Sequence, residues 1–496
     1  MTALLRRTST VLHADASRVV ARLFVPGNEL SAEATSRAGG VVGRVLDLPE
    51  AEVAALAADV RTRWGPRHRD LDGILRQSYG HVAHRVPDES SISDDRRTLL
   101  GAYFTQEQSI EAAALLNPSM VAHPDQDGVA DGSLRVVMSL RAVSEGHVSC
   151  IELRTGTVDA AGDLTLDDPG PHVETGTVSR GSYSRSLFAY GLADAGANDE
   201  ATAYVVSRLP ETFEVDDLDR ALAALHGSDI GRYHAPATDA VASRLAQSTY
   251  VVEFPPETAV AERVLRPFSP PESQGMEDAR FVRFVDDDGV VSYRATYTAF
   301  DGRSIAPMLL QTDDFRRFRI SVVAGPAAVD KGMALFPRTV RGRHLALTRS
   351  DRESTCLASS SDGYLWSGPT PLIGPGSAAD LIQTGNFGSP VETSAGWLVI
   401  THGVGPMREY TLGALLLDLD DPTTVLGRLH EPLLRPAEDE REGYVPNVVY
   451  SCGSLAHGDV LILPYGCSDA AVKVSVVDLP QLLARLLAAG PRPPRG

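Results

Sequence analysis

Short segments of alternating polar and apolar residues fill the chain from Thr249 to Val477. They include T-Y-V-V-E-F, S-Y-R-A-T-Y-T-A-F and V-K-V-S-V-V-D-L, and clusters of Gly, Asp and Pro separate them. A period of two is typical of β-strands, and regular strand spacing indicates an all-β sandwich, barrel or propeller. The strings S-S-S-D-G-Y-L-W, Q-T-D-D-F-R-R-F and D-L-D-D-P each place acidic residues and a turn near a strand end. This loose repeat favours a propeller.

The rest of the chain is expected to contain helices as well as strands. Residues 1–128 are predicted to form a helical N-terminal extension, because P-E-A-E-V-A-A-L-A-A-D-V-R-T-R-W has apolar residues at helical spacing. T-Q-E-Q-S-I-E-A-A-A-L-L-N-P is interpreted as a second helix, with Thr105 and Gln108 forming a capping box. Residues 129–480 are then a mostly β catalytic domain with a helical insertion at about 175–245. Residues 481–496 are expected to be a helix end and a disordered tail.

Composition excludes several classes of partner. The net charge of −19 over 496 residues argues against nucleic acid and an anionic membrane surface. No apolar run approaches the roughly 18 residues of a membrane span, and the four cysteines form no C-x-x-C pair. A cytoplasmic protein with free thiols and no metal site is therefore expected. The helical N-terminal segment is a candidate contact for a homo-oligomer.

The string Q-G-M-E-D-A-R places Glu277 and Asp278 at the start of an expected strand, with Arg280 two residues further on. A carboxyl group held at such a place is a candidate general acid for cleavage of a glycosidic bond. The alternative is a strand cap, in which the Asp278 carboxylate accepts hydrogen bonds from nearby backbone amides. The spacing alone leaves both interpretations open.

Cationic residues recur in the loops that follow. A phosphorolytic enzyme would need such a cluster to hold phosphate in place of a second carboxylate. Solvated surface charge is the alternative for each Arg or Lys, and a core histidine is the alternative for His402. The candidates are Arg303, Lys331, Arg338, Arg349 and His402.

Polar residues at two turns are further candidates for contacts with a substrate. Asp469 follows the strand V-L-I-L-P-Y-G and could bond sugar hydroxyls, or it could cap the turn. Arg141, Glu145 and His147 surround an expected hairpin turn, where they line a pocket or decorate the surface.

Five strings in one order resemble glycoside hydrolase family 130, the mannoside phosphorylases and related β-mannosidases. They are G-M-E-D-A-R, K-G-M-A-L-F-P-R, G-W-L-V-I-T-H-G-V, L-L-D-L-D-D-P and Y-V-P-N-V-V-Y-S-C-G. The resemblance covers about residues 134–478, and the N-terminal segment is similar to that of longer members acting on β-1,2-linked oligomannosides. It implies a five-bladed β-propeller with inverting attack on a terminal β-mannoside, by inorganic phosphate as co-substrate or by water, and no cofactor.

The resemblance also implies roles for individual residues. Asp278 matches the general acid of the family's E-D-P-R motif, although Ala279 stands where the motif has Pro. His402 matches a phosphate-site His, and Arg303 lies near a phosphate-site Arg. Lys331, Arg338 and Arg349 are added to the expected phosphate site. The expected substrate contacts are Glu277, Arg280, Arg141, His147, Asp469 and Tyr297.

Two residues separate phosphorolysis from hydrolysis. Gln383 occupies a position where many phosphorylases of this family have Lys. Losing that cation weakens phosphate binding, because a charge-assisted hydrogen bond is roughly twice as strong as a neutral one. Glu392 could instead act as a base for water. The leading hypothesis is a β-mannoside phosphorylase, and the alternatives are an inverting β-mannosidase and a non-catalytic glycan-binding propeller.

Overall fold

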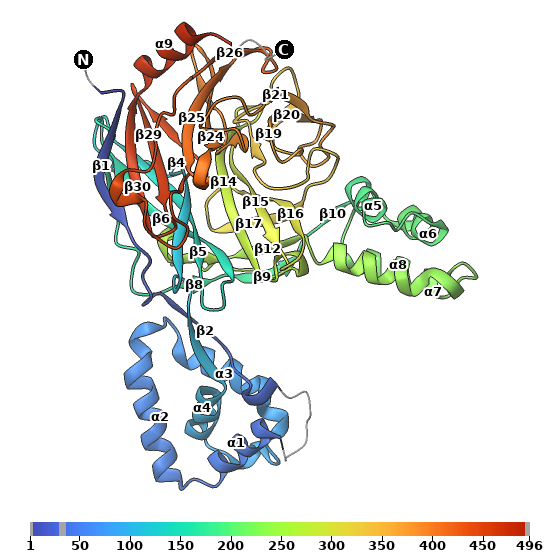
Figure 1. Ribbon diagram of the computed structural model, residues 1–496. Helices are drawn as coiled ribbons and strands as arrows, with labels where there is room; N and C mark the ends of the chain where they lie inside the picture. Colours follow the sequence, from blue (N-terminus) through green and yellow to red (C-terminus); the bar gives the residue numbers. More distant parts are fainter. Residues whose placement is uncertain (1–2, 29–35, 492–496) are drawn as a thin grey trace. The chain divides into compact units, whose positions relative to one another are not determined.

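A computed structural model describes residues 3–28 and 36–491 (Figure 1). The chain divides into two compact units. The first comprises residues 1–14, 113–169 and 175–496, and the second comprises residues 15–112 and 170–174. Within the described ranges, no helix is both long enough and apolar enough to cross a membrane.

The first unit is built mainly from antiparallel meanders of short strands. One meander starts at the E-D-A-R strand and turns at Asp286–Gly289 into the next strand, as the sequence predicts. Its strands are β14 (Gly275–Val285), β15 (Val291–Phe300), β16 (Ile305–Thr312) and β17 (Arg317–Val322), continued by β12 (Tyr250–Glu253) and β9 (Thr177–Arg180).

A second meander belongs to the same sheet. It meets the first where Gly275 of β14 pairs in parallel with Ser149 of β6. A Cβ atom on Gly275 would lie 2.8 Å from the Ser149 backbone nitrogen, so this close approach requires glycine. The strands are β4 (Ala114–Ala122), β5 (Leu134–Val143), β6 (Ser149–Val158) and β7 (Leu164–Leu166), with β13 (Arg263–Leu265) and β8 (Glu174–Thr175).

Three smaller sheets of four or five strands also belong to the first unit. One contains β18 (Ala334–Leu335), β19 (His344–Thr348), β20 (Thr355–Ser360) and β21 (Thr370–Ile373). The next contains β22 (Gln383–Asn386), β23 (Val391–Thr393), β24 (Gly396–Val404), β25 (Tyr410–Leu417) and β26 (Val425–Arg428). The last contains β27 (Val449–Tyr450), β28 (Leu455–His457), β29 (Val460–Cys467), β30 (Ala471–Asp478) and β1 (Leu5–Leu12).

The loose repeat seen in the sequence corresponds to one recurring turn. In each copy an Asp carboxylate accepts hydrogen bonds from the backbone amides two and three residues ahead. The three residues are Asp314, Asp362 and Asp418. This Asx-type geometry reverses the chain at a strand end.

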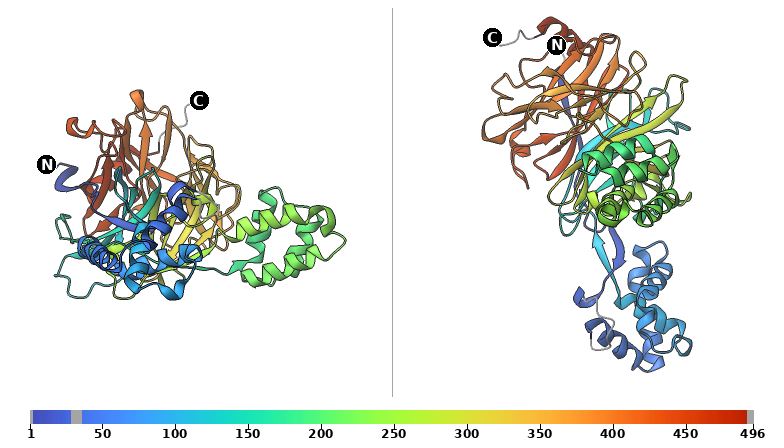
Figure 2. Two further views of the ribbon diagram at one scale, coloured as in Figure 1. Left: turned by 90° about the horizontal axis from the view of Figure 1, so that it is seen from below. Right: turned by 90° about the vertical axis from the view of Figure 1, so that its right-hand side faces the viewer.

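Helices form an insertion and the C-terminal element of this unit. Helices α5 (Arg185–Asp194), α6 (Glu200–Arg208), α7 (Val215–His226) and α8 (Gly231–Ala246) pack on one another around an apolar core, flanked by β10 (Tyr183–Ser184) and β11 (Thr212–Phe213) (Figure 2). They lie in the stretch where a helical insertion was expected. Helix α9 (Leu479–Ala489) follows β30, and residues 492–496 of the expected tail lie outside the described residues.

The second unit contains helices α1 (Arg37–Leu46), α2 (Glu50–Trp64), α3 (Leu71–Val82) and α4 (Asp94–Tyr103), and the paired strands β2 (Val19–Leu23) and β3 (Thr105–Ser109). Its apolar core includes Val42, Val53, Leu99 and Phe104. A cavity of about 290 Å³ lies between α2, α3 and α4.

The prediction that residues 1–128 are helical is wrong at the four strands β1, β2, β3 and β4. β1 pairs with β30, and the supposed helix over T-Q-E-Q-S-I-E-A-A-A-L-L-N-P is β3 followed by β4. The Thr105 hydroxyl donates to the Gly101 carbonyl and lies 2.7 Å from the Ser78 hydroxyl, so it forms no capping box with Gln108. Eight of the nine β4 residues are buried, and this burial on both faces removes the alternation that identifies a strand.

Candidate active site

Asp278 occupies a strained position inside β14. Its φ of 57° is in the left-handed region, which non-glycine residues adopt rarely. The pairing of β14 with β15 shifts register between Glu277 and Arg280, so Asp278 sits in a β-bulge. Bulges re-aim side chains and are common beside active sites. Asp278 is only 7% exposed.

Side chains, and not backbone amides, hold the Asp278 carboxylate. Asn117 Nδ2 donates to Asp278 Oδ1 over 2.5 Å, and Arg141 Nη1 donates to the same oxygen over 3.3 Å. The strand-cap interpretation therefore finds no support in these contacts. A carboxylate bound by an amide and a guanidinium is suited to proton chemistry or to recognition of a polar ligand.

Glu277 joins two cations on the neighbouring side of the bulge. Arg141 Nη2 donates to Glu277 Oε1 and Lys331 Nζ donates to Glu277 Oε2, each over 2.6 Å. Arg141 Nε also donates to Ser149 Oγ over 2.8 Å. Arg141 is thus fixed at three points, and it orients both carboxylates at once.

Arg280 supports the bulge from inside the protein. It is 1% exposed, and its Nη1 donates to the backbone oxygen of Asp278 over 2.8 Å. Its Nε donates to the Phe387 carbonyl over 2.6 Å, and its Nη2 donates to the Tyr450 hydroxyl over 2.9 Å. Arg280 therefore positions Asp278 and links it to β22 and β27.

Opposing effects set the protonation of the two aspartates near Arg141. Burial raises the pKa of Asp278, but the charges of Arg141, Arg280 and Lys331 outweigh it, so the pKa lies below its ordinary value. Burial also raises the pKa of Asp469, which Arg141 only partly offsets. The negative charge of Asp278 also raises the pKa of Asp469. The lowered pKa makes Asp278 a carboxylate at neutral pH.

A second cluster contains Arg349, His402 and Gln383. Arg349 Nη1 lies 3.1 Å from His402 Nε2, and Gln383 Nε2 lies 3.4 Å from the same nitrogen. The nearest carboxylate recorded for Arg349 is that of Asp330, at 4.0 Å. Among the residues that the structure describes, Arg349 Nε and Asn386 Oδ1 are buried and have no hydrogen-bond partner. The cluster can therefore accept further polar groups from a ligand.

His402 is neutral in this arrangement. Burial and the charges of Arg349 and Arg280 lower its pKa well below the ordinary value. Both neighbours of Nε2 are nitrogen donors, whereas Nδ1 is buried and has no hydrogen-bond partner among the described residues. Its ring centroid lies 5.5 Å from that of Tyr450, whose hydroxyl contacts Arg280. Tyr450 therefore connects the His402 cluster to the Asp278 cluster.

The structure brings together seven of the expected residues: Asp278, Glu277, Arg280, Arg141, Lys331, Arg349 and His402. Asp469 borders them through Arg141. His147 is exposed on the hairpin between β5 and β6, where its ring faces Tyr444.

Arg338 and Glu392 lie elsewhere. They pair with each other over 2.6 Å, and Arg338 lies over the Trp397 ring. Glu392 pairs with Trp397 at the start of β24, whereas His402 lies five residues further along that strand. At roughly 3.3 Å per residue this is about 17 Å. The expected phosphate role of Arg338 therefore finds no support in its position, and Glu392 is occupied by Arg338.

Two further expected residues are also separated from the clusters. Tyr297 is 2% exposed, and its hydroxyl donates to Glu272, which also accepts from Tyr250. It is part of the core beneath β14 and not of a substrate surface. Arg303 is exposed in the turn between β15 and β16, and its backbone N–H donates to Asp301. The structure does not bring the side chain of Arg303 into contact with Arg349 or His402.

Sequence reasoning missed Asn117 and Tyr450. Asn117 lies at the end of the segment expected to be a helix, yet it has a φ of 52° and donates to Asp278. Its type carried a signal, because Asn tolerates the left-handed region better than most residues. Tyr450 stood within a motif, but nothing in the local sequence indicated its bond to Arg280.

Comparisons with known proteins identify the family of the chain. The family model of glycoside hydrolase family 130, described as beta-1,4-mannooligosaccharide phosphorylase, matches residues 238–486. The chain belongs to this family.

Two curated relatives share 32% identity with the chain. One is a beta-1,2-mannobiose phosphorylase of Listeria innocua, matched over 45% of this chain and 63% of that protein. The other is a 1,2-beta-oligomannan phosphorylase of a Thermoanaerobacter species, matched over 42% of this chain and 70% of that protein. The chain thus spans about two thirds of the length of these relatives. A solved structure of the Listeria innocua beta-1,2-mannobiose phosphorylase aligns at 22% identity and a TM-score of 0.45, over 77% of this chain and 93% of that one.

Proposed function

We propose that this protein is an inverting glycoside phosphorylase, which cleaves terminal β-mannosides with inorganic phosphate and releases α-mannose 1-phosphate. The names of the two relatives at 32% identity support β-1,2-linked mannooligosaccharides as the substrate class. The observation that carries the proposal is the Arg349–His402 cluster. It offers a guanidinium whose carboxylate partner, Asp330, lies 4.0 Å away, and it is connected through Tyr450 and Arg280 to the buried Asp278.

The two clusters divide the chemistry between them. Arg349, His402 and Gln383 hold phosphate, and an oxygen of that phosphate forms a bond with the anomeric carbon. The bond from that carbon to the glycosidic oxygen breaks on the opposite side, and its electron pair stays on the leaving oxygen. Asp278 supplies the proton that the leaving oxygen takes, directly or through a sugar hydroxyl. Attack from the opposite face inverts the β-mannoside to an α-phosphate.

Substrate binding must protonate Asp278 for this role. In the empty site, Arg141, Arg280 and Lys331 keep the pKa of Asp278 low. A bound phosphate adds negative charge beside Arg349, and a bound sugar removes water from the carboxylate. Both changes favour the protonated form. Binding of the two substrates therefore converts Asp278 into the protonated form that acts as the general acid.

Hydrolysis is the weaker candidate. An inverting hydrolase needs a second carboxylate to activate water on the attack side. The expected base, Glu392, is bound by Arg338 at the far end of β24 from His402. The neutral Gln383 is the one feature that favours water over phosphate. A glycan-binding protein without catalysis remains the alternative from another class.

Initial rates with and without inorganic phosphate test the proposal. β-1,2-Mannobiose and β-1,4-mannobiose are compared in phosphate-free buffer and at increasing phosphate concentration. We expect cleavage of the β-1,2 linkage to require phosphate and to saturate with it. Cleavage at the same rate without phosphate, with oxygen-18 from solvent in the mannose, would establish a hydrolase. Binding of mannobiose without cleavage under either condition would establish a lectin-like protein.

The sheet arrangement supports a five-bladed propeller as part of this proposal. Five antiparallel groups follow one another along the chain, at β4–β7, β14–β17, β18–β21, β22–β26 and β27–β30. The N-terminal strand β1 adds to the last group, so the chain ends would close the ring. We assign the catalytic domain to residues 129–480 together with these closing strands. The four buried free cysteines are compatible with a cytoplasmic location.

A further inference from the structure

An exposed pair of flat rings lies next to the candidate active site. Tyr444 is 69% exposed, and its ring is nearly parallel to that of His147, with centroids 6.3 Å apart and 22° between the planes. His147 is exposed as well. Because most of the Tyr444 side chain is exposed, it contributes little hydrophobic stabilisation to the folded protein. A ligand that covers it would gain the apolar contact.

Both rings are connected to the Asp278 cluster through the backbone. His147 is in the hairpin whose strands carry Arg141 and Ser149. Tyr444 is followed by Val445, whose N–H donates to the carbonyl of Ser468 over 3.1 Å, and Asp469 is the next residue. The two rings thus border the carboxylates that face the sugar.

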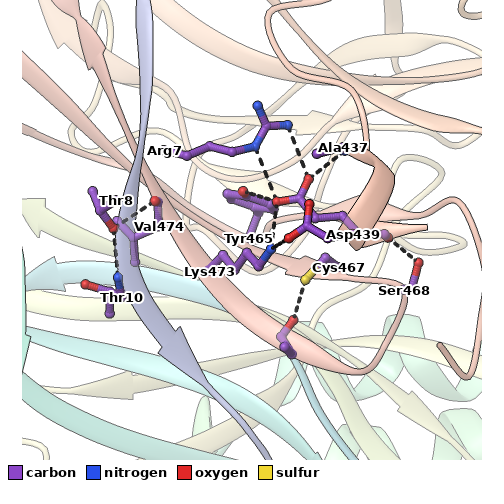
Figure 3. Close-up of polar contacts among 12 residues, drawn as sticks. Arg7, Thr8, Thr10, Ala437, Asp439, Tyr465, Cys467, Ser468, Lys473 and Val474 are labelled. Carbon is purple, nitrogen blue, oxygen red and sulfur yellow. Dashed lines mark hydrogen bonds and ion pairs between the residues drawn. The ribbon is translucent and has the colours of Figure 1, made fainter. Parts of the chain in front are cut away.

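A buried carboxylate fixes the segment that carries Tyr444. Glu440 is 1% exposed and accepts hydrogen bonds from Arg7, Tyr465 and Lys473. Figure 3 shows these three partners converging from β1, β29 and β30. The backbone oxygen of Glu440 accepts from Ser468 Oγ over 2.6 Å, which ties the segment to the turn containing Asp469. Tyr444 therefore stands on a rigid support.

Gly443 shows how closely this segment approaches the Asp469 turn. A Cβ atom at Gly443 would lie 2.2 Å from the carbonyl oxygen of Ser468 and 3.0 Å from the Ala470 side chain. No side chain fits at position 443. The backbone that carries Tyr444 is therefore in contact with the turn that contains Asp469. A surface held in its binding geometry loses little entropy when a ligand arrives.

We propose that Tyr444 and His147 form an aromatic platform for the second mannosyl unit of the leaving group, which mannotriose has and mannobiose lacks. The proposal rests on the phosphorylase function above and makes its substrate an oligosaccharide. The transferred unit reaches the buried Asp278, so the remaining units extend outward across the rim. A pyranose ring has an apolar face of C–H groups that stacks on an aromatic ring.

Equilibrium binding in a background that cannot turn over tests the platform. β-1,2-Mannotriose and β-1,2-mannobiose are titrated calorimetrically into the Asp278→Asn protein, with and without Tyr444→Ala. We expect Tyr444→Ala to raise the Kd for mannotriose by about 3- to 10-fold, and the Kd for mannobiose by less. Tyr444→Phe keeps the ring and should restore mannotriose affinity. The control Val290→Ala removes a side chain that is 61% exposed at the far end of β14.

The outcomes separate this inference from the proposed reaction. Unchanged mannotriose affinity in Tyr444→Ala would overturn the platform, whatever the reaction is. If Tyr444→Phe weakened mannotriose binding as much as Tyr444→Ala does, the platform would also be overturned. The hydroxyl group, and not the ring, would then be responsible for the binding. Phosphate-independent cleavage by the wild-type enzyme would overturn the phosphorylase function and leave the binding test of the platform intact.

Discussion

Asn117 donates a hydrogen bond to Asp278, and both residues have a left-handed backbone conformation. Each residue lies in a β-bulge of its own strand. Their φ angles are 52° and 57°, and Asn117 Nδ2 lies 2.5 Å from Asp278 Oδ1. The β4–β5 pairing shifts register at Asn117, as the β14–β15 pairing does at Asp278. Such backbone conformations cost of order 1–3 kcal/mol each and persist where surrounding structure imposes them. Because both sides of this hydrogen bond are strained, we expect the contact to serve the proposed function.

Replacing Asp278 tests its role as the acid. We expect Asp278→Asn to lower kcat by about 100-fold or more, because a positioned general acid contributes on that scale. The fold should persist, because Asn keeps the shape of the side chain. Asp286→Asn, which changes a carboxylate in the β14–β15 turn, is the matched control. Near-normal turnover with a lowered Tm would mean that Asp278 is structural.

Replacing Asn117 separates backbone strain from the side-chain contact. Glycine adopts a φ of 52° without strain, so Asn117→Gly removes only the amide, whereas Asn117→Ala also adds backbone strain. Hydrogen bonds to charged groups are worth about 1.5–3 kcal/mol, so we expect activity to fall roughly 10- to 100-fold in both. Loss of this donor also raises the pKa of Asp278, and the pH–rate profile should move with it. Unchanged activity and profile in Asn117→Gly would remove Asn117 from the site.

Adding a cation at Gln383 tests the phosphate cluster. Gln383→Lys places an ammonium beside Arg349 and the neutral His402. We expect the KM for phosphate to fall several-fold and to become more sensitive to salt. His402→Ala should raise the KM for phosphate far more than the KM for mannobiose. Equal effects on both substrates would contradict the assignment, and Glu392→Gln serves as the distant control.

The lowered pKa of His402 predicts that the protein becomes less stable in mild acid. The pKa of an unfolded histidine is about 6.5, and burial, Arg349 and Arg280 lower the folded value well below this. Between the two values the unfolded chain binds a proton that the folded chain does not. The free energy of unfolding therefore falls with falling pH, by up to about 1.4 kcal/mol per pH unit. We expect a smaller decrease in Tm between about pH 6.5 and pH 5 for His402→Asn, in phosphate-free buffer; identical decreases would refute this.

The sequence predicted those parts of the fold that alternate. In β15, from Val291 to Phe300, one face of the strand is buried against the core and the other face is less buried. The alternation of residue types in the sequence follows this difference in burial. β4 escaped prediction because its apolar residues are buried on both faces. Asp278, the proposed acid, and His402, the proposed phosphate-site histidine, could be identified from sequence motifs. The pairing of Arg338 with Glu392 did not, because the type of a charged residue does not reveal its partner.

Product analysis on β-1,2-mannobiose tests the central claim most directly. The enzyme is incubated with and without inorganic phosphate, and the products are identified by proton and phosphorus NMR before mutarotation. The account predicts α-mannose 1-phosphate and mannose in equal amounts with phosphate, and no cleavage without it. Two molecules of mannose in both conditions would contradict it, and would require a base other than the occupied Glu392.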